Sequence, residues 1–198
     1  IHPIHEGTTG IQGMDLLGRK LMMKNGKAAA LFMAEVQKTI QKADELCRQF
    51  SSRTDNSGTD SKALQFAIEK LTEAMGLLEK TANTLFGVAQ QKGPACFLAD
   101  ATLFLELFGI VAIAWQWLIQ GTMAVEALHR IDTDGVSKES SEKSEKSGKS
   151  EKERRFYKAK LYTMTYFFRY ELPKVRALAT RLTDGDDLTV TMPHDCFI

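Results

Sequence analysis

One unbroken seam of apolar residues sets the fold class of this chain. Between Leu64 and Ala89 the apolar positions are separated alternately by four and three residues. That spacing aligns the side chains along one face of a helix, as at the a and d positions of a coiled coil. Such a helix needs an antiparallel or coiled-coil-like partner, and no comparable run alternates with the period of two that is typical of strands. The sequence therefore predicts an all-α fold.

Proline and glycine positions divide the chain into helices. No proline lies between Pro3 and Pro94 or between Pro94 and Pro173, so both stretches allow long helices. The Leu172-Pro173 step should kink or end a helix. Together with the seam, this division predicts an antiparallel bundle of about four to five helices. Further turns are expected at Asn25-Gly26, Lys92-Gly93 and Asp184-Gly185.

Two polar segments predict loops. Residues 51–60 are polar and contain a glycine, and Asp60 or Ser61 is the expected start of the next helix. Residues 136–153 consist almost entirely of Ser, Lys and Glu after Val136. Because such a segment cannot bury enough surface to offset its chain entropy, we expect a mobile, solvated loop there. A marginal helix held by Glu–Lys pairs four residues apart is the alternative.

An apolar run from Leu103 to Ile119 raises the question of a membrane span. The run is shorter than the about 20 apolar residues that a spanning helix needs, and it contains Glu106 and Gln116. We therefore expect the central helix of a bundle, surrounded by its neighbours on all sides, with its two tryptophans as packing residues. A membrane-associated bundle is the alternative.

Composition and charge exclude several classes of protein. The chain has 198 residues with 26 Lys and Arg against 25 Asp and Glu, whereas dedicated nucleic-acid-binding proteins carry a basic excess. Its three cysteines form no CxxC pair and its four histidines have no ligand spacing, so no metal site is expected. Unpaired cysteines also favour a reducing compartment.

The chemically most informative segment is the glycine-rich beginning of the chain. Glu6 stands before a loop with glycines at positions 7, 10 and 13, which allow close approach to a ligand or positive φ angles. Thr8 and Thr9 offer hydroxyl groups, and the helix that follows directs free N–H groups and its positive dipole end towards the loop. The spacing differs from the dinucleotide fingerprint. Taken alone, it equally describes a capped loop with a solvated glutamate.

The motif His5-Glu6-Gly7-Thr8-Thr9 and the residues up to Lys20 resemble the C-terminal signature of the acyl-CoA dehydrogenases. The resemblance is greatest to long, bacterial-type members with an extra C-terminal helical domain, such as the methylmercaptopropionyl-CoA dehydrogenases. Two later stretches, LFGIVAIAWQWLIQ and RFYKAKLYTMTYFFRYELP, look like the helices of that domain. The resemblance thus covers nearly the whole chain, with the Ser/Lys/Glu segment as an insertion.

The resemblance implies a flavin oxidoreductase. In this family the glutamate of the motif removes the α-proton of an acyl-CoA thioester, and the β-hydrogen passes as hydride to N5 of FAD. Glu6 stands at that position, and its backbone N–H would polarise the thioester carbonyl together with a flavin ribityl hydroxyl. Gly7 would lie against the substrate. The residues expected to bind FAD are Thr8, Thr9, Gly10 and Gln12.

The resemblance also implies a division of the chain. Residues 1–26 would end the catalytic core, and residues 27–198 would form an accessory helical bundle. We read the chain as the C-terminal part of a longer enzyme, inactive without the domains that hold most of the FAD and the CoA. Aromatic residues between Phe156 and Tyr170 are expected in the core and at interfaces. His5 stands where the family usually has another aromatic residue, which leaves its effect on Glu6 open.

The implied partners follow from the same resemblance. They are an acyl-CoA substrate, an electron-transfer flavoprotein as electron acceptor, and further copies of the protein in a homo-oligomer. Neither nucleic acid nor a membrane span is expected. A bacterial cytoplasm is the expected location, with the mitochondrial matrix as the alternative. The competing interpretation is a helical oligomerisation module derived from the family, in which Glu6 has no catalytic role.

Overall fold

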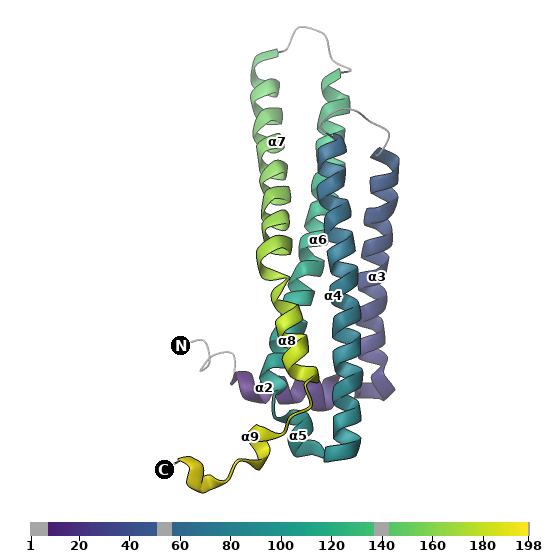
Figure 1. The fold of residues 1–198 in the computed structure, drawn as a ribbon. Coiled ribbons are helices and arrows are strands. Elements are labelled where there is room, and N and C mark those ends of the chain that lie inside the picture. Colours follow the sequence, from purple (N-terminus) through teal and green to yellow (C-terminus); the bar gives the residue numbers. More distant parts are fainter. Residues whose placement is uncertain (1–7, 51–56, 137–142, 198) are drawn as a thin grey trace. The chain divides into compact units, whose positions relative to one another are not determined.

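The computed structural model describes residues 8–50, 57–136 and 143–197, and every regular element in these ranges is helical. This confirms the predicted all-α class (Figure 1). Two of the elements, η1 and η2, are single π-helical turns, and η3 is a 3₁₀ turn. The order along the chain is α2 (Thr9–Asp15), η1 (Leu16–Lys20), α3 (Met23–Phe50), α4 (Ser57–Lys92), α5 (Pro94–Leu98), α6 (Ala101–Val136), α7 (Lys143–Tyr166), η2 (Phe167–Glu171), α8 (Lys174–Thr183), α9 (Leu188–Thr191) and η3 (His194–Phe197).

The chain forms two compact units, and α3, α4 and α6 contribute residues to both. Unit 1 comprises Ile1–Glu35, Glu73–Ala112 and Pro173–Ile198. Unit 2 comprises Val36–Thr72 and Ile113–Leu172. The predicted boundary between residues 26 and 27 concerns the division between a catalytic core and an accessory bundle, and it stays a prediction.

Unit 2 is built from four helical segments, taken from α3, α4, α6 and α7. In Figure 1 the segments lie side by side, and successive segments run in opposite directions. The seam residues Leu64 and Leu71 are fully buried there, together with Leu118 and Met164. Burying this stripe supplies the main favourable free energy for packing α4 against its neighbours.

Polar contacts fix the register of the helices in unit 2. The indole Nε1 of Trp115 donates a hydrogen bond of 2.8 Å to Thr39 Oγ1, which links α6 to α3. Lys158 of α7 places its ammonium group 2.7 Å from both carboxylate oxygens of Asp60 in α4. Asp60 therefore lies inside a helix that begins at Ser57, so the predicted helix start at Asp60 or Ser61 is wrong. A charged partner on α7, which local sequence does not reveal, explains why this aspartate is buried.

Unit 1 contains the short helices and the turns that proline and glycine predict. Pro94 occupies the first turn of α5 after Gly93, whose φ is 85°. Residues Lys24, Asn25 and Gly26 all adopt left-handed conformations and form the predicted turn before the regular part of α3. Leu17, Phe104 and Leu107 are fully buried in this unit.

The Ser/Lys/Glu segment requires a correction. Residues 143–153 belong to α7, and only 137–142 of the predicted loop lie outside the described residues. Lysine and glutamate are good helix formers, and each added residue extends a helix that packing further along α7 already holds. Arg154 pairs with Asp132 of α6, and Arg155 lies 3.1 Å from Glu151 one turn earlier. The predicted mobility of this segment is not tested.

The apolar helix α6 is buried on one side only. Phe104, Val111 and Leu118 are fully buried, but Ile113 is 49% exposed and Met123 is 58% exposed. The expectation of neighbours on all sides is therefore wrong. By length and composition alone, the stretch Ala101–Thr133 is long and apolar enough to cross a membrane. Core helices of soluble proteins meet the same criterion, so this finding does not distinguish them from a span.

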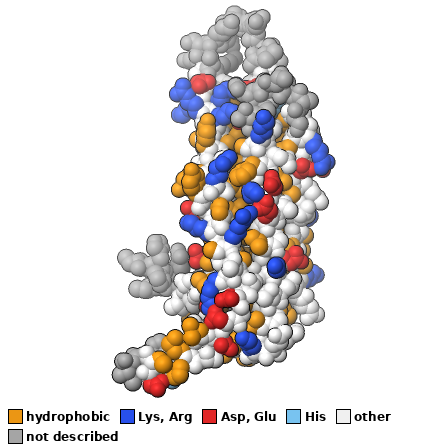
Figure 2. Space-filling view, viewed as in Figure 1, with side chains coloured by type: hydrophobic (Ala, Val, Ile, Leu, Met, Phe, Trp, Pro, Cys, Tyr) orange, Lys and Arg blue, Asp and Glu red, His pale blue; other side chains and the backbone are white. Residues whose placement is uncertain are grey.

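The aromatic residues of α7 and η2 divide between core and surface. Phe168 is buried, as expected for a core residue. Tyr162, Tyr166 and Tyr170 are exposed, and the last two rings stack with their centroids 4.8 Å apart. Figure 2 shows hydrophobic side chains next to Lys and Arg along the part of the surface formed by α7. We call Phe156, Tyr162 and Tyr166 of α7, together with Tyr170 of η2, the aromatic face of α7.

Candidate functional site

The predicted site residues lie at the start of unit 1. Glu6 and Gly7 fall outside the described residues, so their predicted roles as base and substrate contact stay predictions. Thr8, Thr9 and Gly10 are described, and they form the entry and first turn of α2. With Gln12, they bring the four residues expected to bind FAD into little more than one turn of helix.

The first turn of α2 has backbone N–H groups that the helix itself does not satisfy. Thr8 has an extended backbone (φ −79°, ψ 133°) and makes no side-chain cap. Its carbonyl accepts the first bond of the helix, 3.1 Å from the backbone nitrogen of Gln12. The N–H groups of Thr9, Gly10 and Ile11 therefore have no partner within the helix. They leave a local positive potential that favours an anionic or electron-rich ligand.

The start of α2 is exposed. Thr8, Thr9 and Gln12 are exposed, and among the described residues no atom outside the local helix backbone lies within 4 Å of the position that a Cβ on Gly10 would occupy. The start of α2 thus exposes the side chains of two threonines and one glutamine. This donor set fits the polar edges of a flavin or its diphosphate.

Gly13 has a role that differs from the predicted one. We expected it to allow close approach to a ligand or a positive φ, yet its φ is not positive. A Cβ atom on Gly13 would lie 2.6 Å from the carbonyl oxygen of Ala101 and 3.0 Å from the nitrogen of Thr102. The glycine is therefore required because α2 crosses the beginning of α6 with the two backbones in contact. This contact holds the candidate FAD-binding turn against the start of α6, within unit 1.

A charged cluster that the motif does not predict follows on the same segment. Arg19 forms a bidentate pair with Asp15, and its Nη2 lies 2.9 Å from Oδ2. Lys20 lies 3.4 Å from the same carboxylate. The hydrogen bond from Arg19 lowers the pKa of Asp15, and Lys20 adds to this effect. Sequence spacing could have identified the pair, because Asp15 and Arg19 are four residues apart on one helix face.

A metal centre is not formed by the part of the chain that the structure describes. No group of three or more His, Cys, Asp or Glu side chains in it is arranged to hold an ion. The described part of the site can bind and orient a ligand through hydrogen bonds. It contains no proton acceptor for catalysis, because Glu6 lies before the first described residue.

Comparison with known proteins covers nearly the whole chain. Residues 32–193 match the family model described as "Acetyl-CoA dehydrogenase C-terminal like". The 3-methylmercaptopropionyl-CoA dehydrogenase of Ruegeria pomeroyi is 30% identical over 191 residues, which are 96% of this chain. The chain spans 26% of the length of that protein. No solved structure matches the chain.

Proposed function

Since the chain belongs to the acyl-CoA dehydrogenase C-terminal-like family, we propose that it is the C-terminal part of an FAD-dependent acyl-CoA dehydrogenase. The observation that carries this proposal is the exposed first turn of α2, which follows the Glu6-Gly7 motif directly and has no side-chain cap. The enzyme desaturates an acyl-CoA thioester between its α and β carbons.

Glu6 and Gly7 act on the substrate in this proposal. The Glu6 carboxylate removes the α-proton, and the Glu6 backbone N–H donates a hydrogen bond to the thioester carbonyl. That bond stabilises the negative charge that develops on the oxygen as the proton leaves. Gly7 has no side chain, so the thioester can lie against its backbone.

The residues of the first turn of α2 hold the cofactor in this proposal. Thr8 and Thr9 would donate through their hydroxyl groups, and Gly10, which has no side chain, would leave room for the cofactor. Gln12, in the same turn, would contribute an amide that donates and accepts. Bound FAD supplies the chemistry of hydride acceptance, which no amino-acid side chain provides.

The test uses the longest natural polypeptide that contains this chain. We expect it to bind FAD, and the flavin absorbance band to be bleached by an acyl-CoA under anaerobic conditions. Glu6→Gln should keep the FAD and lower the rate of bleaching by a factor of about a hundred or more, because a general base is lost. Glu45→Gln, a surface change on α3, is the matched control. Normal reduction of the Glu6→Gln flavin would refute the assignment.

The remaining partners and the location belong to the same proposal. Reduced flavin needs an electron acceptor, and an electron-transfer flavoprotein fits that requirement. We place the enzyme in a bacterial cytoplasm, with the mitochondrial matrix as the alternative. Fractionation of the source cells and reduction of purified electron-transfer flavoprotein by the enzyme and its substrate would test both statements.

A second candidate function is supported by the aromatic face of α7. Four large aromatic side chains exposed on two consecutive helical elements, α7 and η2, are typical of a protein interface. In this alternative the bundle mediates homo-oligomerisation and Glu6 is idle. Sedimentation of the wild-type protein and of Tyr162→Ser, Tyr166→Ser tests the association. A colourless protein that still forms an oligomer would favour the alternative over the enzyme.

A further inference from the structure

An apolar hollow lies within unit 1, away from the first turn of α2. Its volume is about 290 Å³, and it is lined by residues of α3, α4, α6 and the turn before α3. Its buried wall includes Leu78 and Phe104, and Phe32 and Phe108 form an aromatic pair with ring centroids 4.8 Å apart. Small residues make the space, because Gly26, Ala29, Ala30 and Ala82 stand where larger side chains would fill it.

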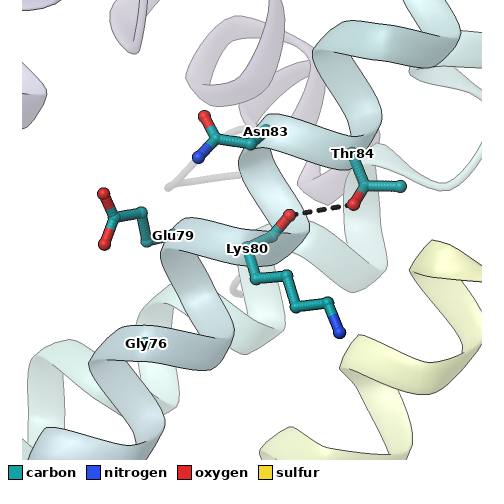
Figure 3. Close-up of a pocket in the computed structure, with 5 residues that line it drawn as sticks. All are labelled: Gly76, Glu79, Lys80, Asn83 and Thr84. Atoms are coloured by element: carbon teal, nitrogen blue, oxygen red, sulfur yellow. Dashed lines mark hydrogen bonds between the residues drawn. The ribbon is translucent and has the colours of Figure 1, made fainter.

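Two polar side chains stand at the edge of this hollow. Glu79 and Asn83 line it, and they also line a shallow polar depression of about 510 Å³ on the surface of α4. Figure 3 shows Glu79 and Asn83 leaving α4 on the same side, while Lys80 and Thr84 point away from them. Among the described residues, none forms an ion pair with the Glu79 carboxylate. Both side chains are exposed, so the apolar hollow has a solvent-exposed carboxylate at its edge.

We propose that this hollow binds a small primary alkylammonium ion. The alkyl chain lies against the phenylalanine rings, and the ammonium group pairs with the Glu79 carboxylate. The amide oxygen of Asn83, one helical turn along α4, accepts a second hydrogen bond from the same group. An anionic ligand of equal shape is excluded, because its head would meet the carboxylate. This proposal does not depend on the proposed dehydrogenase activity.

The volume of the hollow sets the size of the ligand. An apolar cavity of about 150 Å³ holds one benzene molecule, so about 290 Å³ holds a chain of roughly twice that bulk. Ligand sites in proteins typically combine apolar walls with a few polar groups that orient the ligand. A hexyl or octyl chain with one amine meets both conditions. The aromatic walls also favour a cation near the mouth.

Isothermal titration calorimetry on the protein compares three probes with the same chain: hexylammonium chloride, hexan-1-ol and sodium hexanoate. We expect hexylammonium to bind, hexanol to bind at least about tenfold more weakly, and hexanoate to give no binding. Glu79→Gln should lower the affinity for hexylammonium about tenfold and leave the affinity for hexanol unchanged. Glu69→Gln, on the same helix but outside the hollow, is the matched control and should change neither affinity.

Methyl resonances of labelled methionines locate the site. Hexylammonium should shift the Met22 and Met33 signals, which line the hollow, and leave that of Met123 unchanged. Ala30→Leu narrows the hollow from an exposed position and should abolish binding of both hexylammonium and hexanol. Equal binding of hexanoate, no effect of Glu79→Gln, or shifts only at other methionines would overturn the proposal. The proposal would also be overturned if the wild-type protein did not bind hexylammonium and Ala30→Leu changed the oligomeric state. That result would assign the hollow to a protein contact.

Discussion

The backbone of Gly13 touches the backbone of Ala101. A Cβ atom on the glycine would lie 2.6 Å from the Ala101 carbonyl oxygen, and helix backbones cannot yield as a flexible side chain can. This contact fixes α2, and with it the turn from Thr8 to Gln12, against the start of α6. The placement of the candidate FAD-binding turn thus depends on the absence of a side chain at Gly13.

Gly13→Ala should lower the free energy of unfolding by about 1–3 kcal/mol, because it overpacks this backbone contact. It should also weaken FAD binding by the longer enzyme, since α2 must move. Gly109→Ala is the control: nothing lies within 4 Å of its Cβ position on α6, and it should be neutral or stabilising. Thermal unfolding and flavin titration measure the two effects. If Gly13→Ala and Gly109→Ala had the same thermal stability and the same affinity for FAD, the backbone contact at Gly13 would not be what positions α2.

Gly26→Ala should destabilise the protein by about 1–2 kcal/mol through its backbone conformation. Gly26 has a φ of 78° and the added Cβ would have its nearest neighbour at 3.8 Å, so no clash contributes. Gly87→Ala, at an open position within α4, should instead stabilise by up to about 1 kcal/mol. Chemical denaturation should therefore show a lower free energy of unfolding for Gly26→Ala and a higher one for Gly87→Ala than for the wild-type protein. A neutral Gly26→Ala would mean that the turn adapts to a right-handed conformation.

Lys158→Met should cost about 1.5–3 kcal/mol, because it leaves the nearly buried Asp60 carboxylate without its charged partner. Arg176→Met breaks a pair of similar length, 2.9 Å to Glu73, but both of its side chains are exposed. It should cost less than about 1 kcal/mol. Double-mutant cycles with Asp60→Asn and Glu73→Gln separate the two coupling energies. Equal coupling energies would contradict the importance of burial.

Cys47 should resist thiol reagents at about pH 8, while Cys196 reacts. Burial, with a smaller contribution from Asp44, raises the pKa of the Cys47 thiol from its ordinary value of 9.0 to about 11. Its sulfur also lies 3.6 Å from the Ser61 carbonyl oxygen, to which the protonated thiol donates. Mass spectrometry after timed alkylation would show the order of reaction. Rapid labelling of Cys47 in folded protein would refute its burial.

The same raised pKa makes stability depend on pH. Below pH 9.0 the thiol is protonated in both the folded and the unfolded state, and its contribution is fully present. As the pH rises from 9.0 to about 11, the unfolded state ionises first and this contribution is lost. Comparing the free energy of unfolding of the wild-type protein with that of Cys47→Ala at each pH isolates the contribution of the Cys47 thiol from other groups that titrate in this range. If the difference in free energy of unfolding between the two proteins stayed constant across this pH range, the prediction would be contradicted.

Sequence periodicity was sufficient to predict the class of fold. Six of the eight seam positions between Leu64 and Ala89 are buried, and Ala82 and Ala89 are half-buried, because residues spaced at helical period share one face whatever their partners are. The turns at Gly26, Gly93 and Gly185 were also predictable, since each takes a positive φ that glycine favours.

The errors arose where a distant residue decides the outcome. Asp60 looked like a helix start, but Lys158, far along the chain, stabilises it inside α4. The polar residues 143–153 looked like a loop, but they extend a helix that is packed further on. Gly13 looked like part of a ligand loop, yet its partner is the backbone of Ala101. The sequence around each of these residues does not indicate such long-range contacts.

Each compact unit is assembled from separated stretches of the chain, three for unit 1 and two for unit 2. Helices α3, α4 and α6 would each have to be cut in the middle to separate them. No single recombination event could therefore transfer one unit to another gene and leave it folded. A transfer between genes that kept every helix whole would have to carry residues of both units together.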